Sequence, residues 1–420
     1  MATIRERWWP APIPRLANGE VDKEKARAAG KRCTYICDFF DQQGVRRQKS
    51  FKRRKDADSF MVTTRAQVQT GVYTPESTSA TVGEAIDLWI ERAVAEQLEH
   101  GTRVQYAQHK AHILALIDGS TKLAKLTQAR VEQLRDDLLK AHSRPMARKI
   151  LASFKGVLRE AKRRGLVAQN VAADTTIGTN GRHKRKLRVG VDLPTVDEFR
   201  AMLATASDLK SRAMISLAGI AGLRASELRG LPWADLDLGP KPGVTITQRA
   251  DAWGKIGSPK SESAHRTIEL GEMTVRALRE WRLAQPPLVT KDEHGNEIKR
   301  PRTLVFGTAS DKPDMLGNLQ DRVLDKAQVQ AGIVVPVLDR NGKLLLDDAG
   351  KPKMRAKYSW HALRHFAITS WIVGERHDLK TVQYLAGHAT LAMTIDRYGH
   401  FVPKKDAHAR ASEHEAALLG

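Results

Sequence analysis

Three segments near the end of the 420-residue chain contain residue types that could act on a phosphodiester. They are YSWHALRHFAITSW (358–371), YLAGH (384–388) and TIDRYGHF (394–401). Together they contain only one carboxylate residue, Asp396. Cleavage of a phosphodiester without a metal ion needs a nucleophile, positive groups at the non-bridging oxygens and a proton for the leaving oxygen. Tyrosine, arginine and histidine can supply these functions, so the segments predict metal-independent phosphoryl transfer.

Two arginines are the expected phosphate ligands. Arg364 lies three residues after His361, so both side chains share one face of a predicted helix. Arg224 opens a helix in AGLRASELRGLPWADLDL (221–238), and Glu227 follows one turn later. A guanidinium can bind phosphate through two parallel hydrogen bonds and stays charged at any working pH.

The histidines also allow a metal-binding interpretation. His361 and His365 are four residues apart, as in the HExxH zinc motif, but Ala362 stands where that motif has its catalytic glutamate. Taken alone, each histidine would be more typical of a hydrogen-bonded structural residue than of a catalyst. Because the histidines belong to a larger set, we expect a catalytic site with no metal ion and no other cofactor.

The charge of the chain predicts a polyanionic partner. Lys and Arg number 70 against 48 Asp and Glu, which gives a formal net charge of +22 and indicates binding to double-stranded DNA. Only Cys33 and Cys37 are present, in no disulfide or zinc pattern. The N-terminus has no apolar signal segment, and the longest apolar run, 214–223, is too short to cross a bilayer. We therefore expect a cytoplasmic, nucleoid-associated protein without a membrane partner.

Hydrophobic periodicity and turn signals predict a mainly α protein with small β-sheets (α+β). The length exceeds what one hydrophobic core usually supports, and we expect three domains. Residues 1–72 should form a small β-sheet with one helix, and 80–172 a four-helix domain. A basic linker is expected at 173–190 and a helix-rich domain with a small sheet at 191–420. Turn dipeptides within the last domain predict surface hairpins to which we assign no chemistry.

Clusters of basic residues predict the DNA-facing surfaces. RRQKSFKRRK (46–55) contains seven Lys or Arg and no acidic residue, and Glu160 is the only carboxylate within the last helix of the four-helix domain. A solvated surface would mix both signs, and edge-strand lysines also discourage aggregation, but the density of arginine favours phosphate contact. The expected DNA-binding residues are Arg46, Arg47, Lys49, Lys52, Arg53, Arg54, Lys55, Arg148, Lys149, Lys155, Arg159, Arg163, Lys184, Arg185 and Lys186.

Together these residues resemble the tyrosine recombinases of the phage-integrase family. In that family an arginine of a GLRxxE motif, a hairpin lysine, an HxLRH helix, a GH pair and a late tyrosine form the active site. The matching residues in this sequence, in order, are Arg224, Lys260, His361, Arg364, His388 and Tyr398, with Glu227 at the acidic supporting position. Lys255 lies close to Lys260, so the choice of lysine stays open. The resemblance covers 191–420, extends to a core-type DNA-binding domain at 80–172, and reaches more loosely to an arm-type domain at 1–72.

The resemblance implies a site-specific integrase that cuts and rejoins DNA through a 3′-phosphotyrosyl intermediate and integrates or excises a mobile element. Tyr398 would be the nucleophile and His361 would accept its proton. Lys260 would protonate the leaving 5′-oxygen, and His388 would hydrogen-bond the phosphoryl group. His365 would support the helix.

The implied partners are DNA attachment sites and further protein subunits. Recombination needs four strand cuts, which implies a homo-tetramer on DNA, and a DNA-bending host factor and an excision factor are candidate partners. The segment 405–420 predicts a short final helix that is a candidate contact with a neighbouring protomer.

Other interpretations of the residue set stay open. A type IB topoisomerase-like nicking-closing enzyme would use the same nucleophile and clamp, although two extra basic domains favour site recognition. A non-catalytic DNA-binding regulator on the same scaffold would not cleave DNA. A DDE-type transposase would need three spaced carboxylates, and no convincing set is present.

Overall fold

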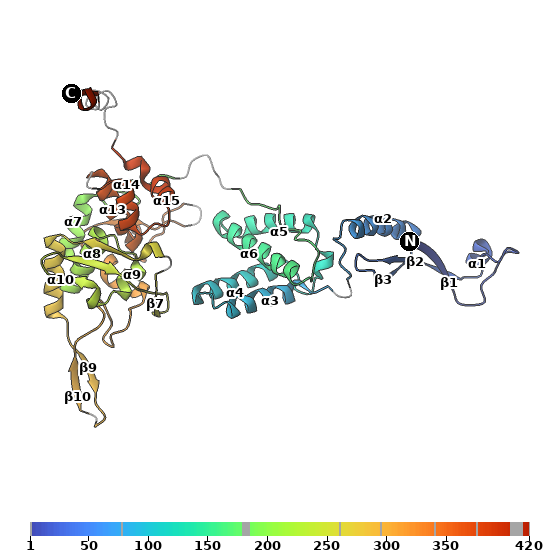
Figure 1. Ribbon diagram of the computed structural model, residues 1–420, viewed down its shortest axis with the longest axis horizontal. Coiled ribbons are helices and arrows are strands. Elements are labelled where there is room, and N and C mark those ends of the chain that lie inside the picture. The colour runs from blue at the N-terminus through green and yellow to red at the C-terminus, as the bar shows by residue number, and fades with distance from the viewer. Residues whose placement is uncertain are drawn as a thin grey trace. The chain divides into compact units, whose positions relative to one another are not determined.

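The chain divides into two compact units, residues 1–181 and 182–420, each coloured by residue number in Figure 1. The computed structural model describes residues 2–76, 79–178, 185–259, 262–294, 296–339, 342–374, 377–403 and 415–419. Within these ranges no helix is long and apolar enough to cross a membrane. The architecture is mainly α with small antiparallel sheets, as the sequence predicted.

The first unit begins with a three-stranded antiparallel sheet of order β1-β2-β3. Its elements are β1 (Thr3–Trp9), α1 (Lys23–Ala28), β2 (Arg32–Phe40), β3 (Arg46–Phe51) and α2 (Arg54–Gln69). Ala57 and Met61 of α2 pack on Cys37 of β2 in a small buried cluster. The strand β1 was not predicted, because charged residues stand between its apolar ones, although Pro10 directly follows its last residue.

Four helices form the rest of the first unit, as expected. They are α3 (Val82–Ala95), α4 (His100–Leu114), α5 (Gln128–Ala141) and α6 (Arg144–Arg163). A capping box begins α3: Thr81 Oγ1 accepts from the Glu84 N–H at 3.2 Å, and Glu84 accepts from the Thr81 N–H at 2.7 Å. Phe154 of α6 is fully buried at the centre of the apolar cluster between the helices.

Single buried apolar residues attach the two described ends of the predicted linker at 173–190 to the two units. Ile177 is buried in the core of the first unit. Leu187 is buried in the core of the second unit, where its carbonyl is hydrogen-bonded to His400 Nε2 at 2.9 Å. Residues 179–184, which include Lys184, lie outside the described residues.

The second unit surrounds one large apolar core. Its helices are α7 (Val196–Thr205), α8 (Leu209–Ile220), α9 (Ala225–Gly230), α10 (Glu272–Ala284), α11 (Leu316–Leu319), α12 (Lys326–Gln330), α13 (Trp360–Val373), α14 (Leu379–Ala386) and α15 (Leu391–Tyr398). Its sheet of order β4-β5-β8 consists of β4 (Leu236–Asp237), β5 (Gly243–Ile246) and β8 (Arg266–Glu269). Three strand pairs complete it: β6 (Arg249–Ala250) with β7 (Ile256–Gly257), β9 (Leu288–Lys291) with β10 (Glu297–Arg300), and β11 (Val334–Pro336) with β12 (Met354–Ala356).

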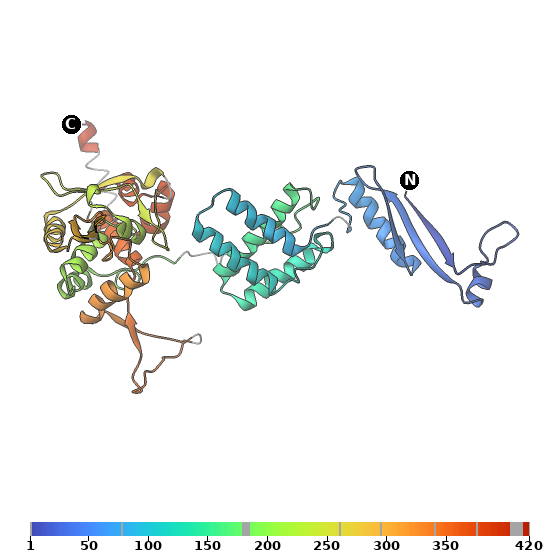
Figure 2. The same cartoon turned by 90° about the horizontal axis from the view of Figure 1, so that it is seen from below.

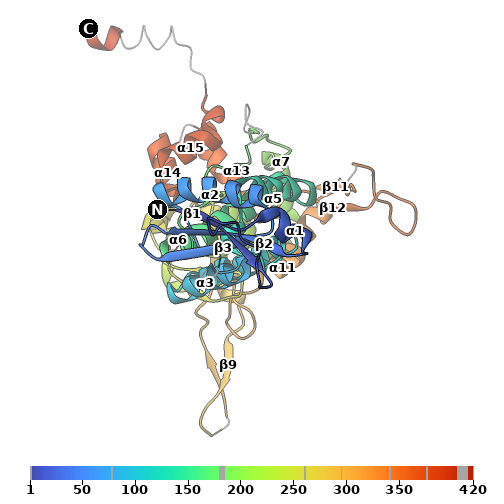
Figure 3. The same cartoon turned by 90° about the vertical axis from the view of Figure 1, so that its right-hand side faces the viewer.

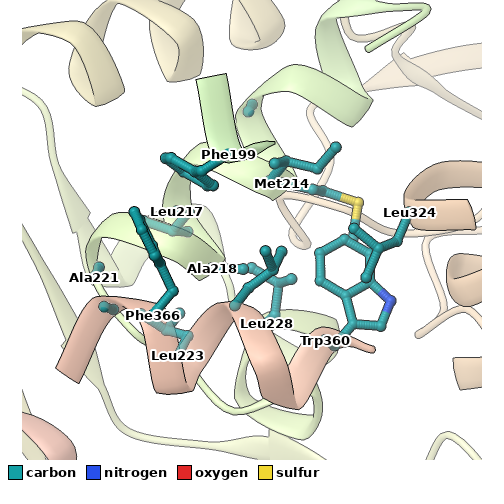
Figure 4. Close-up of a cluster of buried hydrophobic side chains, with 14 of the residues drawn as sticks. Phe199, Met214, Leu217, Ala218, Ala221, Leu223, Leu228, Leu324, Trp360 and Phe366 are labelled. Atoms are coloured by element: carbon teal, nitrogen blue, oxygen red, sulfur yellow. The ribbon is translucent and has the colours of Figure 1, made fainter. Parts of the chain in front are cut away.

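The helix α13 lies at the centre of this core. Figure 4 shows Trp360 and Phe366 of α13 beside Phe199 of α7 and apolar residues of α8, and the rings of Phe199 and Phe366 lie 4.7 Å apart. Eleven of the fourteen α13 residues are buried. Because packing fixes the rotation of this helix, the directions of its polar side chains are fixed as well.

Surface hairpins occur where turn signals predicted them. The hairpin β9–β10 projects from the body of the second unit in Figure 1 and Figure 3, and the segment joining β11 to β12 projects in Figure 2. Asp347 begins a turn in this second segment, with its Oδ1 accepting from the N–H groups of Ala349 at 3.0 Å and Lys351 at 2.9 Å. Gly350 closes the turn with a φ of 75°.

We predict that Gly219→Ala destabilises the second unit. A Cβ at this position would lie 2.2 Å from the ring of Phe199, which is itself buried among α8 and α13. We expect the free energy of unfolding to fall by about 1–3 kcal/mol, the usual cost of overpacking, in a urea titration. Gly317→Ala is the matched control, because a Cβ there meets no atom within 4 Å. Equal stability of the two variants would contradict the packing described for α8.

Candidate active site

Three arginines donate to three successive carbonyls at the C-terminal end of α14. Arg266 Nε donates to the Leu385 carbonyl at 2.7 Å, Arg364 Nη2 to that of Ala386, and Arg224 Nη2 to that of Gly387 at 2.6 Å. The last carbonyls of a helix have no partner within the helix and carry partial negative charge, so they stabilise cations. The predicted phosphate ligands Arg224 and Arg364 are therefore brought together by one helix end.

Gly387 is required by this arrangement. It adopts the left-handed conformation at the end of α14, with φ 58° and ψ 46°. A Cβ would lie 3.0 Å from Arg266 Nη1 and 3.3 Å from Arg224 Nη1. The glycine of the GH pair thus gives the guanidinium groups room to reach the helix end, and it places His388 directly after them.

Glu227 balances part of this positive charge. It is 2% exposed and forms salt bridges with Arg224 at 2.7 Å and with Arg266 at 2.9 Å. Burial alone would raise the pKa of this carboxyl, but the hydrogen bonds and charge of Arg266, with Arg224, lower it to about 2. Glu227 therefore stays ionised and fixes the first arginine at the start of α9.

Among the described residues, no carboxylate forms an ion pair with Arg364. Its Nη1 donates to the Gly222 carbonyl at 2.6 Å, and its side chain is among the largest fully buried ones in the described chain. Burial, with the neighbouring Arg224, lowers the pKa of this guanidinium from its usual value. A buried cation with only carbonyl partners is a strong site for an anion, because an anion would supply the missing opposite charge.

The tyrosine expected as the nucleophile lies beside this cluster but is not exposed. Tyr398 is the last residue of α15 and is 2% exposed. Its hydroxyl is hydrogen-bonded to His365 Nδ1 at 2.6 Å, and its ring lies parallel to that of His388, 6.1 Å away. Burial raises the pKa of the phenol to about 12, although Arg364 and other arginines oppose this. The helix ends at Tyr398, its phenol is packed rather than free, and Gly399 follows with a right-handed φ of −57°.

The structure places His365, rather than His361, against the phenol. His365, expected only to support the helix, is hydrogen-bonded to the Tyr398 hydroxyl, whereas His361, expected to accept its proton, is exposed. The two rings lie 4.4 Å apart. The two histidines share a face of α13, but His361 lies in the first turn of the helix, whereas His365 lies one turn further along, where its ring reaches the Tyr398 hydroxyl at the end of α15. His388 Nδ1 is hydrogen-bonded to Thr394 Oγ1 at 2.9 Å, which orients its ring beside Tyr398.

The structure describes one of the two candidate lysines of the predicted site. Lys260 lies outside the described residues. Lys255, the alternative, is exposed in the turn between β6 and β7, where its N–H donates to Asp251 Oδ1 at 2.9 Å. The hairpin β6–β7 contacts α9, which begins directly after Arg224.

Several predicted DNA-binding residues are engaged in ion pairs. On β3, Arg46 pairs with Asp38 at 2.5 Å and Arg47 with Asp41 at 2.8 Å, while Lys49 pairs with a glutamate after α2. Likewise Arg54 pairs with Asp58, Arg163 with Glu160, and Arg185 with Asp192. The partners of Arg46, Arg47 and Lys49 lie outside the basic segment 46–55, so its sequence does not show them, whereas Asp58 and Glu160 lie on the same helices as the arginines they pair with. Lys52, Arg53, Lys55, Arg148, Lys149, Arg159 and Lys186 are exposed, and Lys155 is half-buried.

Arg266 is the functional residue that the sequence analysis missed. Its side chain is 0% exposed, and it joins Glu227, the Ala264 carbonyl and the end of α14. A signal was available, because Arg266 shares the inward-facing register of β8 with the buried Ile268. A charged residue on the apolar face of a strand indicates a buried ionic contact.

We predict that acidification destabilises the second unit through its buried histidines. Burial lowers the pKa of His365 to about 3 and that of His388 to about 4, whereas an unfolded chain protonates histidine near pH 6.5. Stability is thus fully present above pH 6.5 and is lost as the pH falls towards these values, by at most about 1.4 kcal/mol per pH unit for each histidine. Urea titrations between pH 7.5 and 5 give the free energy of unfolding at each pH. This free energy should fall less steeply with decreasing pH in His365→Asn than in the native chain. An unchanged slope would contradict the assigned burial, and His294→Asn in the exposed β9–β10 turn is the control.

Comparisons with known proteins show the family of this chain. Residues 194–405, half of the chain, match the model of the phage integrase family. A tyrosine recombinase XerC-like protein of Caldanaerobacter subterraneus subsp. tengcongensis is 23% identical over 331 residues, covering 78% of this chain and 81% of the relative. An integrase of Streptomyces ambofaciens is 24% identical over 332 residues, covering 76% of each chain.

Solved structures share the fold. The Tn1549 transposon integrase in complex with transposon right end DNA superimposes with a TM-score of 0.57 at 17% identity, covering 80% of this chain and 99% of that one. A lambda integrase tetramer bound to a Holliday junction contains a chain with a TM-score of 0.53 at 14% identity, covering 89% and 94%. The sequence resemblance is confirmed: this chain belongs to the phage integrase family and is a tyrosine-type site-specific DNA recombinase.

Proposed function

We propose that this recombinase cuts each DNA strand with Tyr398 while Arg224 and Arg364 hold the scissile phosphate. The observation that carries the proposal is the convergence of both arginines and the phenol at the end of α14. The tyrosyl oxygen forms a bond to phosphorus, and the bond from phosphorus to the 5′-oxygen breaks. A phosphodiester replaces a phosphodiester, so the strand can rejoin by the reverse reaction without an energy source.

Proton transfer in this mechanism needs a movement of Tyr398. The buried, neutral phenol must leave its hydrogen bond with His365 before it can reach a bound phosphate. His365 can accept the phenolic proton across this hydrogen bond before it breaks, and His361 is the alternative acceptor. Desolvation by the surrounding protein and the charge of Arg364 lower the pKa of both imidazoles, so both are neutral and able to accept the proton. His388 donates a hydrogen bond to the phosphoryl oxygens, and a lysine of the β6–β7 region, Lys260 or Lys255, gives a proton to the leaving 5′-oxygen.

Recognition of DNA is assigned to both units. The expected stripe on α6 is formed by Arg148, Lys155 and Arg159, which follow one another at spacings of seven and four residues and so share a face. Arg5 and Arg7 lie at exposed positions of β1 and extend the group of basic residues near β3. The sequence analysis did not single them out. An antiparallel sheet of this size can enter a DNA groove, and this sheet would read a second class of site.

Integration or excision needs several copies of the chain. We infer a homo-tetramer on two attachment sites, with a DNA-bending host factor and an excision factor as further partners. The helical segment 415–419 ends in Leu418 and Leu419, which are 70% and 80% exposed. Apolar residues this exposed support a contact with a neighbouring protomer.

We predict that Tyr398→Phe abolishes covalent joining to DNA. The change removes one hydroxyl and almost no packing volume, so the chain should fold and bind core-site DNA with unchanged affinity. The measurement is the protein–DNA adduct formed on a nicked suicide substrate, followed by sequencing of the modified peptide. Tyr384→Phe, which alters an exposed tyrosine of α14, is the matched control and should react normally. An adduct on another residue would refute the mechanism, and an absence of any adduct with the native chain would favour a non-catalytic regulator.

We predict that Arg148→Ala combined with Arg159→Ala weakens DNA binding without changing the fold. Both residues are exposed, and each contact with a phosphate releases a counterion. The slope of log affinity against log salt concentration should therefore become shallower by about 2 in a fluorescence titration. Arg135→Ala is the control, since Arg135 is paired with Glu132 and Asp136 on α5. A native slope in the double variant would remove α6 from the interface.

A further inference from the structure

Arg229 is a buried arginine that the proposed mechanism does not use. It lies on α9, five residues after Arg224, and is 3% exposed. Its Nε donates to the Asp314 carbonyl at 2.5 Å, and its Nη1 donates to the Asp251 carbonyl at 2.8 Å. Both partners are peptide carbonyls from segments far from α9 in the sequence.

The Asp251 carbonyl belongs to the first residue of the turn that presents Lys255. In this turn the Asp251 N–H donates to the Lys255 carbonyl at 2.9 Å, and Asp251 Oδ1 accepts from the N–H groups of Trp253 and Lys255. Gly254 supplies the required positive φ of 83°. Arg229 therefore holds the hairpin β6–β7 at the base of its turn rather than at a side chain.

A second contact joins the same two elements. Gly230, the last residue of α9, lies so close to β6 that a Cβ would be 2.7 Å from the Ala250 nitrogen. Gln248 Nε2 donates to the Gly230 carbonyl at 2.7 Å. The end of α9 is thus fastened to the hairpin by backbone contact and by two side-chain hydrogen bonds to peptide carbonyls.

Filling space does not explain an arginine at this position. A buried cation loses its hydration, and burial lowers the pKa of Arg229 below its usual value. An apolar side chain of similar volume would fill the position at lower cost, because it has no charge to desolvate. What the guanidinium adds is a fixed geometry between Asp251 and Asp314.

We propose that Arg229 is a positioning residue that sets the place of the lysine hairpin relative to the phosphate ligand Arg224. The short helix α9 carries Arg224 at its start and Arg229 near its end, so it acts as a rigid spacer between the clamp and the proton donor. The inference rests on the proposed function, in which a lysine of this region protonates the leaving 5′-oxygen. Loss of Arg229 should then impair protonation of the leaving group more than binding of the phosphate.

A sulfur atom in place of the bridging 5′-oxygen separates these two effects. In the normal reaction the bond from phosphorus to oxygen breaks and the oxygen takes a proton from the lysine. A thiolate leaves without that proton, because a thiol is far more acidic than an alcohol, with a pKa of about 8.5 for cysteine. A variant that only misplaces the proton donor is therefore rescued by sulfur, whereas a variant with a damaged phosphate clamp is not.

The experiment compares single-turnover cleavage of matched oxygen and sulfur suicide substrates. Arg229→Met should be about 100-fold slower than the native chain on the oxygen substrate, the usual effect of a misplacement near 1 Å, and close to native on the sulfur substrate. Arg224→Lys should be slow on both substrates. Arg276→Met, which removes an exposed arginine of α10, should be native on both.

Two results would overturn the inference: equal slowing of Arg229→Met on both substrates, or native rates on both. Thermal unfolding first establishes whether this variant folds. If it does not fold, Arg229→Lys decides the question, because lysine keeps the charge and can reach one of the two carbonyls. The cleavage rate of Arg229→Lys must then be partly reduced on the oxygen substrate and restored on the sulfur substrate. Failure of the native chain to form the Tyr398 adduct with either substrate would instead refute the proposed function.

Discussion

The end of α14 is the constraint on which the site depends. Guanidinium groups that are to share one phosphate repel each other while no phosphate is bound. Here Arg224, Arg266 and Arg364 each donate to a different carbonyl of residues 385–387. The unpaired carbonyls of a helix end and the ionised Glu227 offset that repulsion, at about 0.3–2 kcal/mol for each favourable cation at a helix end. The arginines are therefore arranged before DNA arrives, and little has to be reorganised for phosphate to be bound.

The other elements of the second unit serve this helix end. The buried α13 fixes the direction of Arg364 and His365, and α9 fixes Arg224 through Glu227. The short α15 follows α14 directly and returns Tyr398 to the same place. The protruding hairpins take no part in this packing, which explains how the chain accommodates them without disturbing the site.

Sequence reasoning predicted what depends on local spacing and missed what depends on contacts between distant segments. Local signals mark the capping boxes and the four helices of the first unit. They also mark the motif residues Arg224, Arg364, His388 and Tyr398. The strand β1 lacked one, because its alternation is carried by charged residues. Three features follow only from the fold. They are the carboxylates that pair with Arg46 and Arg47, the contacts of Arg266, and the place of His365 rather than His361 beside the phenol.

The burial of Tyr398 also bears on how a cell tolerates such a protein. A chromosome presents an immense excess of phosphodiesters over the few at which exchange is wanted. An exposed phenolate next to preformed guanidinium groups would cleave any DNA backbone that reached it. Because the phenol is neutral, 2% exposed and hydrogen-bonded to His365, DNA that binds only briefly meets no exposed phenolate. In the proposed mechanism, the free energy needed to withdraw this side chain favours cleavage in complexes that last long enough for Tyr398 to move.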